Sequence, residues 1–135
     1  MRHKILIVIA NYYPDISNNL LKKAKLVLKN KAFVKVINVP GIFEIPVVIS
    51  KNIKNFDGFL ALGCVIKGET PHFDFISNAT TSAIMNLSIS SKKPIANGII
   101  TCLNKKQAKA RSSNTNKKNK GLEASKAILS VLNNF

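Results

Sequence analysis

The sequence predicts an α/β fold: a three-layer α/β/α sandwich in which helices flank a four-stranded parallel sheet. Strand-like apolar runs alternate with helix-like apolar stripes four times along the chain, an order that favours parallel strands joined by helices. The predicted strands are apolar on both faces, as in sheets that helices cover from both sides. With 135 residues, 46% of them hydrophobic, the chain is long enough for one domain, residues 1–135, with its own buried core.

The first strand is expected at residues 5–10, a continuous apolar run. Its basic start, followed by an apolar stretch, superficially looks like a signal peptide. The run is short, however, and Asn11 and a Tyr-Tyr-Pro sequence follow without a small-residue cleavage site, so a buried strand is the better interpretation. The next apolar residues repeat at helical spacing and predict the first helix: Ile16, Leu20, Leu21, Ala24, Val27 and Leu28.

The middle of the chain repeats this pattern twice. A second strand is expected at residues 33–39, closed by Pro40 and Gly41, and Pro46 is tolerated in the next helix because it falls in the first turn. A third strand is expected at residues 59–66. The stripes of the two helices are Ile45, Val48, Ile49 and Ile53, then Phe73, Ile76, Thr80, Ala83, Ile84 and Leu87.

The last third of the chain adds a fourth strand at residues 94–102, a short helix at residues 105–111 and a final helix from about Lys120. Residues 112–118 include no apolar side chain, so we expect a mobile loop there. The buried face of the final helix is expected to be Ala124, Ala127, Ile128, Val131 and Leu132.

The charge of +15, from 19 lysines, two arginines and six acidic residues, raises the question of nucleic-acid binding. The lysines are scattered through every predicted helix and are not interleaved with aromatic residues. This pattern is typical of a solvated surface, so nucleic acid is disfavoured as a partner. No apolar run approaches the roughly 18 residues that a membrane helix requires, which predicts a soluble protein with no membrane partner.

Cys64 and Cys102 lie inside apolar runs, with no second metal ligand at a suitable spacing. We therefore expect no disulfide framework and no metal site, but two buried thiols in a reducing cytoplasm.

Residues 63–74, which run from the third strand into the third helix, contain the strongest candidate for chemistry. Thr70 is a good N-cap and Pro71 suits the first helical position, which places His72 in the first turn. Free backbone amides there, with Gly68 allowing close approach, form an anion site. We expect His72 to be neutral and able to transfer protons near pH 7. The alternative is a surface histidine, but ligands in such folds bind at the carboxyl ends of strands.

Arg111 is the only internal arginine in a chain that otherwise uses lysine. Because a guanidinium grips carboxylate or phosphate with two hydrogen bonds, Arg111 predicts an oxyanion ligand. A chance arginine on a solvated helix is the alternative. Lys120 adds positive charge for the same ligand, although one lysine among 19 is a weak indication.

Aromatic and acidic side chains follow two other strands. Phe43 and Glu44 come after the turn at Pro40 and Gly41, where an aromatic beside an acid suits a planar heterocycle with polar edges. Phe43 is alternatively a core residue, and Glu44 an acid that favours a helix start. Tyr12, after the first strand, either stacks on a ring or closes a turn.

Taken together, these segments resemble the lumazine synthase family, and with their flanking elements they span nearly the whole chain. The resemblance implies a flavodoxin-like form of the predicted fold. The matching pieces, in family order, are V-P-G-I-F-E-I-P at 39–46, G-C-V-I-K-G-E-T-P-H-F at 63–73, P-I-A-N-G-I-I-T at 94–101, Q-A-K-A-R at 107–111 and N-K-G-L-E-A at 119–124.

The resemblance implies a transferase that condenses 5-amino-6-(D-ribitylamino)uracil with 3,4-dihydroxy-2-butanone 4-phosphate, without a cofactor, to give 6,7-dimethyl-8-ribityllumazine, phosphate and water. This is the penultimate step of riboflavin biosynthesis. The resemblance also implies a cytoplasmic homopentamer, or a larger assembly built from pentamers, with active sites between subunits. Riboflavin synthase is a further candidate partner.

The family's site residues carry over to numbered positions. His72 matches the proton donor, and Arg111 matches the phosphate-binding arginine, which with Asn97 comes from the neighbouring subunit. Glu69 and Thr70 match the phosphate loop, to which Lys120 adds charge. The residues that match the pyrimidine and ribityl positions are Tyr12, Ile42, Phe43, Glu44, Cys64, Val65 and Ile66.

Several positions depart from the family pattern. Tyr12 replaces the usual Phe, Asn97 stands where many members have Phe, and Glu69 is bulkier and more acidic than the usual Ala or Gly, with Lys67 nearby to offset it. The segment between Arg111 and Lys120 is one residue longer than in common members, and the chain begins almost at the first strand. These departures leave open a protein on the same scaffold that binds flavin or lumazine without turnover.

Overall fold

The computed structural model describes residues 2–68, 71–114 and 118–135. It confirms the predicted fold class, with a four-stranded sheet of order β2-β1-β3-β4 in which every neighbouring pair is parallel. The elements are β1 (His3–Ala10), α1 (Pro14–Leu28), β2 (Ala32–Val39), the 3-10 helix η1 (Ile42–Glu44), α2 (Ile45–Lys51), β3 (Gly58–Ile66), α3 (His72–Ser91), β4 (Ile95–Cys102), α4 (Lys105–Arg111) and α5 (Lys120–Asn134).

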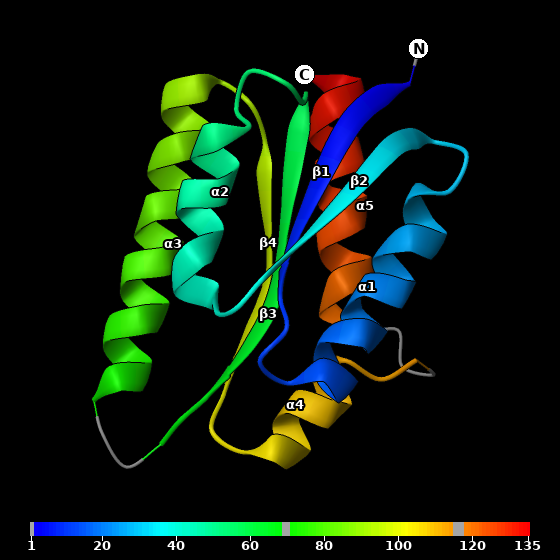
Figure 1. The fold of residues 1–135 in the computed structure, drawn as a ribbon. Helices are drawn as coiled ribbons and strands as arrows, with labels where there is room; N and C mark the ends of the chain where they lie inside the picture. Colours follow the sequence, from blue (N-terminus) through cyan, green and yellow to red (C-terminus); the bar gives the residue numbers. More distant parts are fainter. Residues whose placement is uncertain (1, 69–70, 115–117) are drawn as a thin grey trace.

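Helices cover both faces of the sheet, which gives three layers (Figure 1). Helices α2 and α3 lie on one face and α1 and α5 on the other, while α4 sits at the end where β4 finishes. The two faces have separate cores, one under α1 and α5 and one under α2 and α3. Because β1 and β3 occupy the middle of the sheet, residues 5–10 and 58–64 are buried throughout.

Strand β2 departs from the prediction of strands buried on both faces. Phe33 is 58% exposed, and Val34 and Lys35 are exposed beside it. The physical reason is its place in the sheet: β2 pairs only with β1 and lies at the edge, so it lacks the second neighbouring strand that helps to bury a central strand.

The buried face of α5 also differs from the predicted one. Ala124 and Ile128 are buried as expected and Leu132 packs against the core, but Ala127 and Val131 are exposed. The helix instead buries Gly121 and Ser125, whose hydroxyl donates to the Leu122 carbonyl at 2.9 Å. Small residues allow α5 to pack closely on α1, and this contact decides its rotation.

Helix α3 begins one residue later than predicted. Pro71 is the N-cap, without a side-chain capping hydrogen bond, and His72 is the first helical residue. Thr70, the predicted N-cap, lies outside the described residues. Further along α3, Thr80 and Ile84 are buried, and the other members of the predicted stripe are half-buried.

The segment after α4 is a loop, as predicted, but side-chain hydrogen bonds tie its first residues to the rest of the fold. Ser112 is buried and its hydroxyl donates to the Ala108 carbonyl at 2.8 Å. The Asn114 amide donates to the Asn19 side chain on α1 at 2.9 Å. Polar side chains therefore hold this segment where apolar ones are missing, while residues 115–117 lie outside the described part of the chain.

The predicted positions of Pro46 and the short helix at residues 105–111 are confirmed, since Pro46 lies in the first turn of α2 and α4 spans Lys105–Arg111. The carboxyl ends of β1, β3 and β4 lie at the same end of the sheet, together with the starts of α1, α3 and α4 (Figure 1). Across the described ranges, no helix has the length and apolar character needed to cross a membrane.

Candidate active site

A hollow of about 650 Å³ opens at the carboxyl ends of β1 and β3, between η1 and the start of α3. It brings together all seven residues that the sequence assigned to the pyrimidine and its ribityl chain, along with His72. The residues that line it are Tyr12, Tyr13, Gly41, Ile42, Phe43, Glu44, Cys64, Val65, Ile66, Gly68, His72, Phe73 and Ile76. We call it the ring hollow.

The turn after β1 places Tyr12 at the edge of the ring hollow. The Tyr13 carbonyl accepts hydrogen bonds from the amides of Ile16 and Ser17, and the buried Ser17 hydroxyl donates to the Ala10 carbonyl at 2.8 Å. The turn is thus fixed to the strand it follows. The Tyr12 ring meets the Tyr13 ring edge to face, with centroids 4.9 Å apart, and is 72% exposed.

The opposite wall is built by η1. Ile42 is buried against Gly63 of β3, where a β-carbon would come within 2.9 Å of the Ile42 Cγ2. With Ile42 anchored, Phe43 is 60% exposed, so its alternative assignment to the core is wrong. Gly41, in extended conformation, precedes η1 and lies with Glu44 on the same wall.

The floor of the ring hollow comes from the end of β3. Burial raises the pKa of the Cys64 thiol to about 12, and contact with Cys102 adds to this effect. Both cysteines are free and buried. The pKa of Tyr13 is also raised, chiefly by burial and then by Tyr12 and Cys64. Cys64 and Tyr13 therefore stay protonated near neutral pH and contribute no anionic nucleophile.

A second hollow of about 470 Å³ lies along the outer edge of β4, where α4 and α5 approach it. It holds the three remaining described site residues, Asn97, Arg111 and Lys120. The complete lining is Asn97, Ile99, Ile100, Thr101, Arg111, Lys118, Lys120 and Glu123. We call it the anion hollow, because three cations and one acid face it.

Two elements position the charged groups of the anion hollow. Arg111, the last residue of α4, turns back to β4, where its Nη1 donates to the Thr101 carbonyl at 3.1 Å and to the Cys102 Sγ at 3.6 Å. Lys120, the first residue of α5, lies 3.8 Å from a Glu123 carboxylate oxygen. The Nη1 group of Arg111 is thus held against β4, while the other N–H groups of the guanidinium stay available to a ligand.

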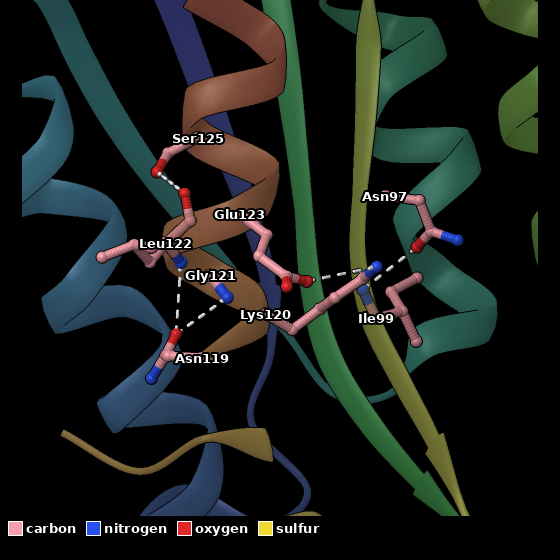
Figure 2. A network of polar contacts seen from close by, with 8 residues as sticks. All are labelled: Asn97, Ile99, Asn119, Lys120, Gly121, Leu122, Glu123 and Ser125. Carbon is pink, nitrogen blue, oxygen red and sulfur yellow. Dashed lines mark hydrogen bonds and ion pairs between the residues drawn. The ribbon is translucent and has the colours of Figure 1, made fainter. Parts of the chain in front are cut away.

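Lys120 owes its place to the cap before it. The Asn119 side chain is buried and accepts from the amides of Gly121 and Leu122, as Figure 2 shows. Its own amide donates to the Ser113 carbonyl at 3.2 Å. In the same view, Asn97 lies on β4 across from Lys120, and its side-chain oxygen accepts from the Ile99 amide at 3.0 Å.

The structure thus divides the predicted site residues into two groups. No described residue lines both hollows, and His72 and Arg111 belong to different ones. Glu69 and Thr70, predicted at the phosphate loop, lie outside the described residues.

Sequence reasoning missed several lining residues. Phe73 and Ile76 belong to the apolar stripe of α3 and were assigned to the core, although both are only half-buried at the ring hollow. Tyr13 follows Tyr12 directly, and Glu123 lies one turn after Lys120. Their position next to Tyr12 and Lys120, two predicted site residues, was the feature of the sequence that could have identified them.

A third groove, about 500 Å³, runs between α1 and β2 and is walled by aliphatic side chains with Lys22, Lys25 and Lys29 at its rim. None of the described site residues lines it. Its position at the sheet edge, away from the carboxyl ends of the central strands, separates it from the candidate chemistry.

Comparison with known proteins decides the family. The profile of the family described as 6,7-dimethyl-8-ribityllumazine synthase matches residues 2–135. The chain belongs to this family. Among curated relatives, the 6,7-dimethyl-8-ribityllumazine synthase of Agrobacterium fabrum is 43% identical over 136 residues, covering 95% of this chain and 91% of that protein. The Bartonella henselae protein of the same name is 44% identical over 133 residues, covering 95% of this chain and 85% of that protein.

Membership in this family confirms the enzymatic function that the motifs indicated: a transferase of riboflavin biosynthesis that forms 6,7-dimethyl-8-ribityllumazine. The substrates are accordingly a pyrimidine and a sugar phosphate.

Proposed function

We propose that the active site of this enzyme is assembled at a seam between two copies of the chain, from the ring hollow of one and the anion hollow of the other. The observation that carries this proposal is the separation of His72 from Arg111 into two hollows of a single chain. The reaction needs proton transfer and phosphate binding at the same place. We therefore propose that His72 of one copy and Arg111 of a neighbouring copy meet at one site.

In this proposal the ring hollow binds 5-amino-6-(D-ribitylamino)uracil. Tyr12 and Phe43 offer exposed aromatic faces to the ring, and Ile42, Val65 and Ile66 give it apolar contact. Glu44 accepts hydrogen bonds from the ring or the ribityl hydroxyls. Cys64, protonated at the floor, acts as an apolar wall rather than a nucleophile.

The anion hollow binds the phosphate of 3,4-dihydroxy-2-butanone 4-phosphate. Arg111 donates two hydrogen bonds to it and Lys120 adds charge, while Asn97 closes the site by hydrogen bonding. Glu69 and Thr70 are proposed to complete the phosphate loop from the His72 side.

Proton transfer is the role proposed for His72. The pyrimidine amine attacks the ketone, and the adduct loses water to form an imine. A proton then leaves the adjacent carbon as phosphate departs with its bonding electrons, and the resulting enol becomes a second ketone. Attack of the ribitylamino nitrogen on this ketone closes the ring and expels a second water. His72 takes protons from the nitrogen and returns them to the departing oxygen. General acid–base catalysis of this kind raises the rate by about 10²–10⁴-fold. Holding two reactants in register supplies most of the remaining acceleration, and no metal or redox cofactor takes part.

A homopentamer, or a larger assembly of pentamers, is the proposed building block. An exposed apolar face on α3 supports self-association: Phe75, Met85 and Ile89 are 69%, 58% and 69% exposed and fall within one sector of the helix. A face of this kind is the usual material of an interface between copies. We place the enzyme in the cytoplasm, in keeping with its two free cysteines, and propose riboflavin synthase as its partner.

Steady-state kinetics test the proposal. Purified protein mixed with both substrates forms the lumazine chromophore faster than the spontaneous reaction, and Arg111→Ala raises the KM for the phosphorylated substrate by roughly 10- to 100-fold, as the loss of charge-assisted hydrogen bonds predicts. The KM for the pyrimidine stays unchanged. Equal rates with and without protein, together with tight lumazine binding, would instead make this chain a binding protein, and an unchanged KM would remove Arg111 from the phosphate site.

A further inference from the structure

We propose that Gln107 is a positioning residue for the phosphate grip: it fixes the start of α4 so that Arg111, one turn later, meets its ligand in a single orientation. This inference rests on the role of Arg111 proposed above. Gln107 touches neither hollow, so it acts through the helix and not through the substrate.

The first observation is a pair of reciprocal hydrogen bonds at the start of α4. The Asn104 side chain accepts from the Gln107 amide at 2.9 Å, and the Gln107 side-chain oxygen accepts from the Leu103 amide at 2.8 Å. These two bonds satisfy two backbone donors and tie the first turn of α4 to the residue before its N-cap. Only two residues, Leu103 and Asn104, separate β4 from α4, so the cap sets the orientation of α4 relative to the strand.

The second observation is that the contacts form a closed path. From Leu103 the path runs through Gln107 along one turn of α4 to Arg111, whose guanidinium donates to the Thr101 carbonyl, two residues before Leu103. The cap at one end of α4 and the guanidinium at the other are thus tied to residues 101–103, where β4 ends. A shift of the helix start moves Arg111 off Thr101.

The middle of α4 transmits this constraint because it is well held. Ala108 is fully buried, and the Ser112 hydroxyl donates to the Ala108 carbonyl at the end of the helix. Seven residues in this arrangement move together, so orientation set at Gln107 reaches Arg111.

Because its side-chain hydrogen bond is exposed, Gln107 is expected to orient α4 without contributing much to the stability of the fold. The Gln107 and Leu103 hydrogen bond is exposed, so water replaces it at little cost when the side-chain acceptor is removed. Stability then changes little, but water does not fix the direction of α4. The expected consequence is a loss of substrate grip in a protein that remains folded.

A double-mutant cycle tests the inference. Gln107→Met keeps the length of the side chain and removes its acceptor, and it is compared with Arg111→Ala and with the double variant, each checked for the same oligomer by light scattering. We expect Gln107→Met to raise the KM for the phosphorylated substrate roughly tenfold, as one lost charge-assisted bond would, with the pyrimidine KM unchanged. In the Arg111→Ala background the same substitution has no further effect. Hydrogen exchange at the Leu103 amide accelerates in Gln107→Met.

The outcomes distinguish the two proposals. If Arg111→Ala raises the KM and Gln107→Met does not, Gln107 has no positioning role and the phosphate site stands. If Gln107→Met raises the KM equally with and without Arg111, its effect is general to the fold, and the inference is overturned. If Arg111→Ala leaves the KM unchanged, the phosphate site and the inference fail together.

Discussion

Gly121 is the residue where α5 meets the backbone of α1, and Gly121→Ala tests how that contact sets the anion hollow. A β-carbon at this position would overlap the Leu20 carbonyl oxygen and lie 2.8 Å from the Leu20 carbonyl carbon and 3.0 Å from its Cα. All three atoms belong to backbone inside a helix, so they do not move aside as a flexible side chain would. Helix α5 must shift away from α1.

The expected loss of unfolding free energy follows from the contact between α1 and α5 that the shift loosens. The contact buries Leu20 and Ala24 of α1 against Ala124 and Ile128 of α5, and forced overpacking of such a site costs about 1–3 kcal/mol. The higher helix propensity of alanine offsets at most about 1 kcal/mol. A net loss of roughly 1–2 kcal/mol lowers the Tm by about 4–8 °C for a chain of this size.

Thermal unfolding by circular dichroism, at one protein concentration, measures this loss. The matched control is Gly68→Ala, because among the described residues no atom outside its chain neighbours lies within 4 Å of a β-carbon built on Gly68. Its Tm should stay within about 2 °C of the parent, as expected for an exposed substitution. An unchanged Tm for Gly121→Ala would refute the argument that backbone contact at Leu20 fixes α5, and equal losses in both variants would point to glycine itself and not to the contact.

Three further predictions follow from the site. Asn119→Ala removes the side chain that accepts from two amides at the start of α5, and it should lower the free energy of unfolding by about 1–2 kcal/mol. Asn104→Ala, at the exposed cap of α4, should lower it by less. Denaturant unfolding of both variants measures the difference, and equal losses would contradict the prediction. Arg111→Lys keeps the charge but loses the forked donor, so it should retain most of the KM defect of Arg111→Ala; full recovery would mean that charge alone suffices. Burial raises the pKa of Cys64 from 9.0 to about 12, so Cys64 in the folded protein should resist iodoacetamide at pH 8.5 while the unfolded chain reacts. Rapid labelling of the native Cys64 would contradict this. The stability that the protonated thiol contributes is present below pH 9.0 and is lost as the pH rises toward 12.

The sequence predicted the parts of the fold whose patterns have one solution. Residues 5–10 and 59–66 are uninterrupted apolar runs, and only the centre of a parallel sheet buries both faces of such strands. Pro46 marked the first turn of α2 for the reason that its missing amide has no partner there.

Other features depended on contacts that no local pattern records. The run at residues 33–39 is mostly apolar and differs from the central strands only in carrying Lys35 and Asn38. The strand order of the structure is what puts it at an edge. The rotation of α5 is decided by Gly121 and Ser125, which apolar periodicity does not count. The polar segment after α4 was expected to move, yet Ser112 and Asn114 hold it by hydrogen bonds to partners both local and distant.

The candidate site shows the same division. Chemistry and resemblance selected His72, Arg111 and their companions, because their residue types suit proton transfer and phosphate binding. Their distribution over two hollows follows from the order β1-β3-β4, which places the end of β3 in the interior and the edge of β4 outside. The spacing of Asn104 and Gln107 fits a helix cap, but the hydrogen bond from the Leu103 amide to the Gln107 side chain could be found only from distances.

Mixing two impaired variants tests the shared active site most directly, with activity measured at a phosphorylated-substrate concentration far below the raised KM of Arg111→Ala, where both variants are nearly inactive. His72→Ala and Arg111→Ala are purified, dissociated and reassembled together. If His72 and Arg111 act from adjacent copies, about one quarter of the seams in an equal mixture regain both groups, and activity returns to about one quarter of the parent value. If both groups of an active site come from one chain, every mixed assembly stays as inactive as its parents, and the account of a site built between copies is contradicted.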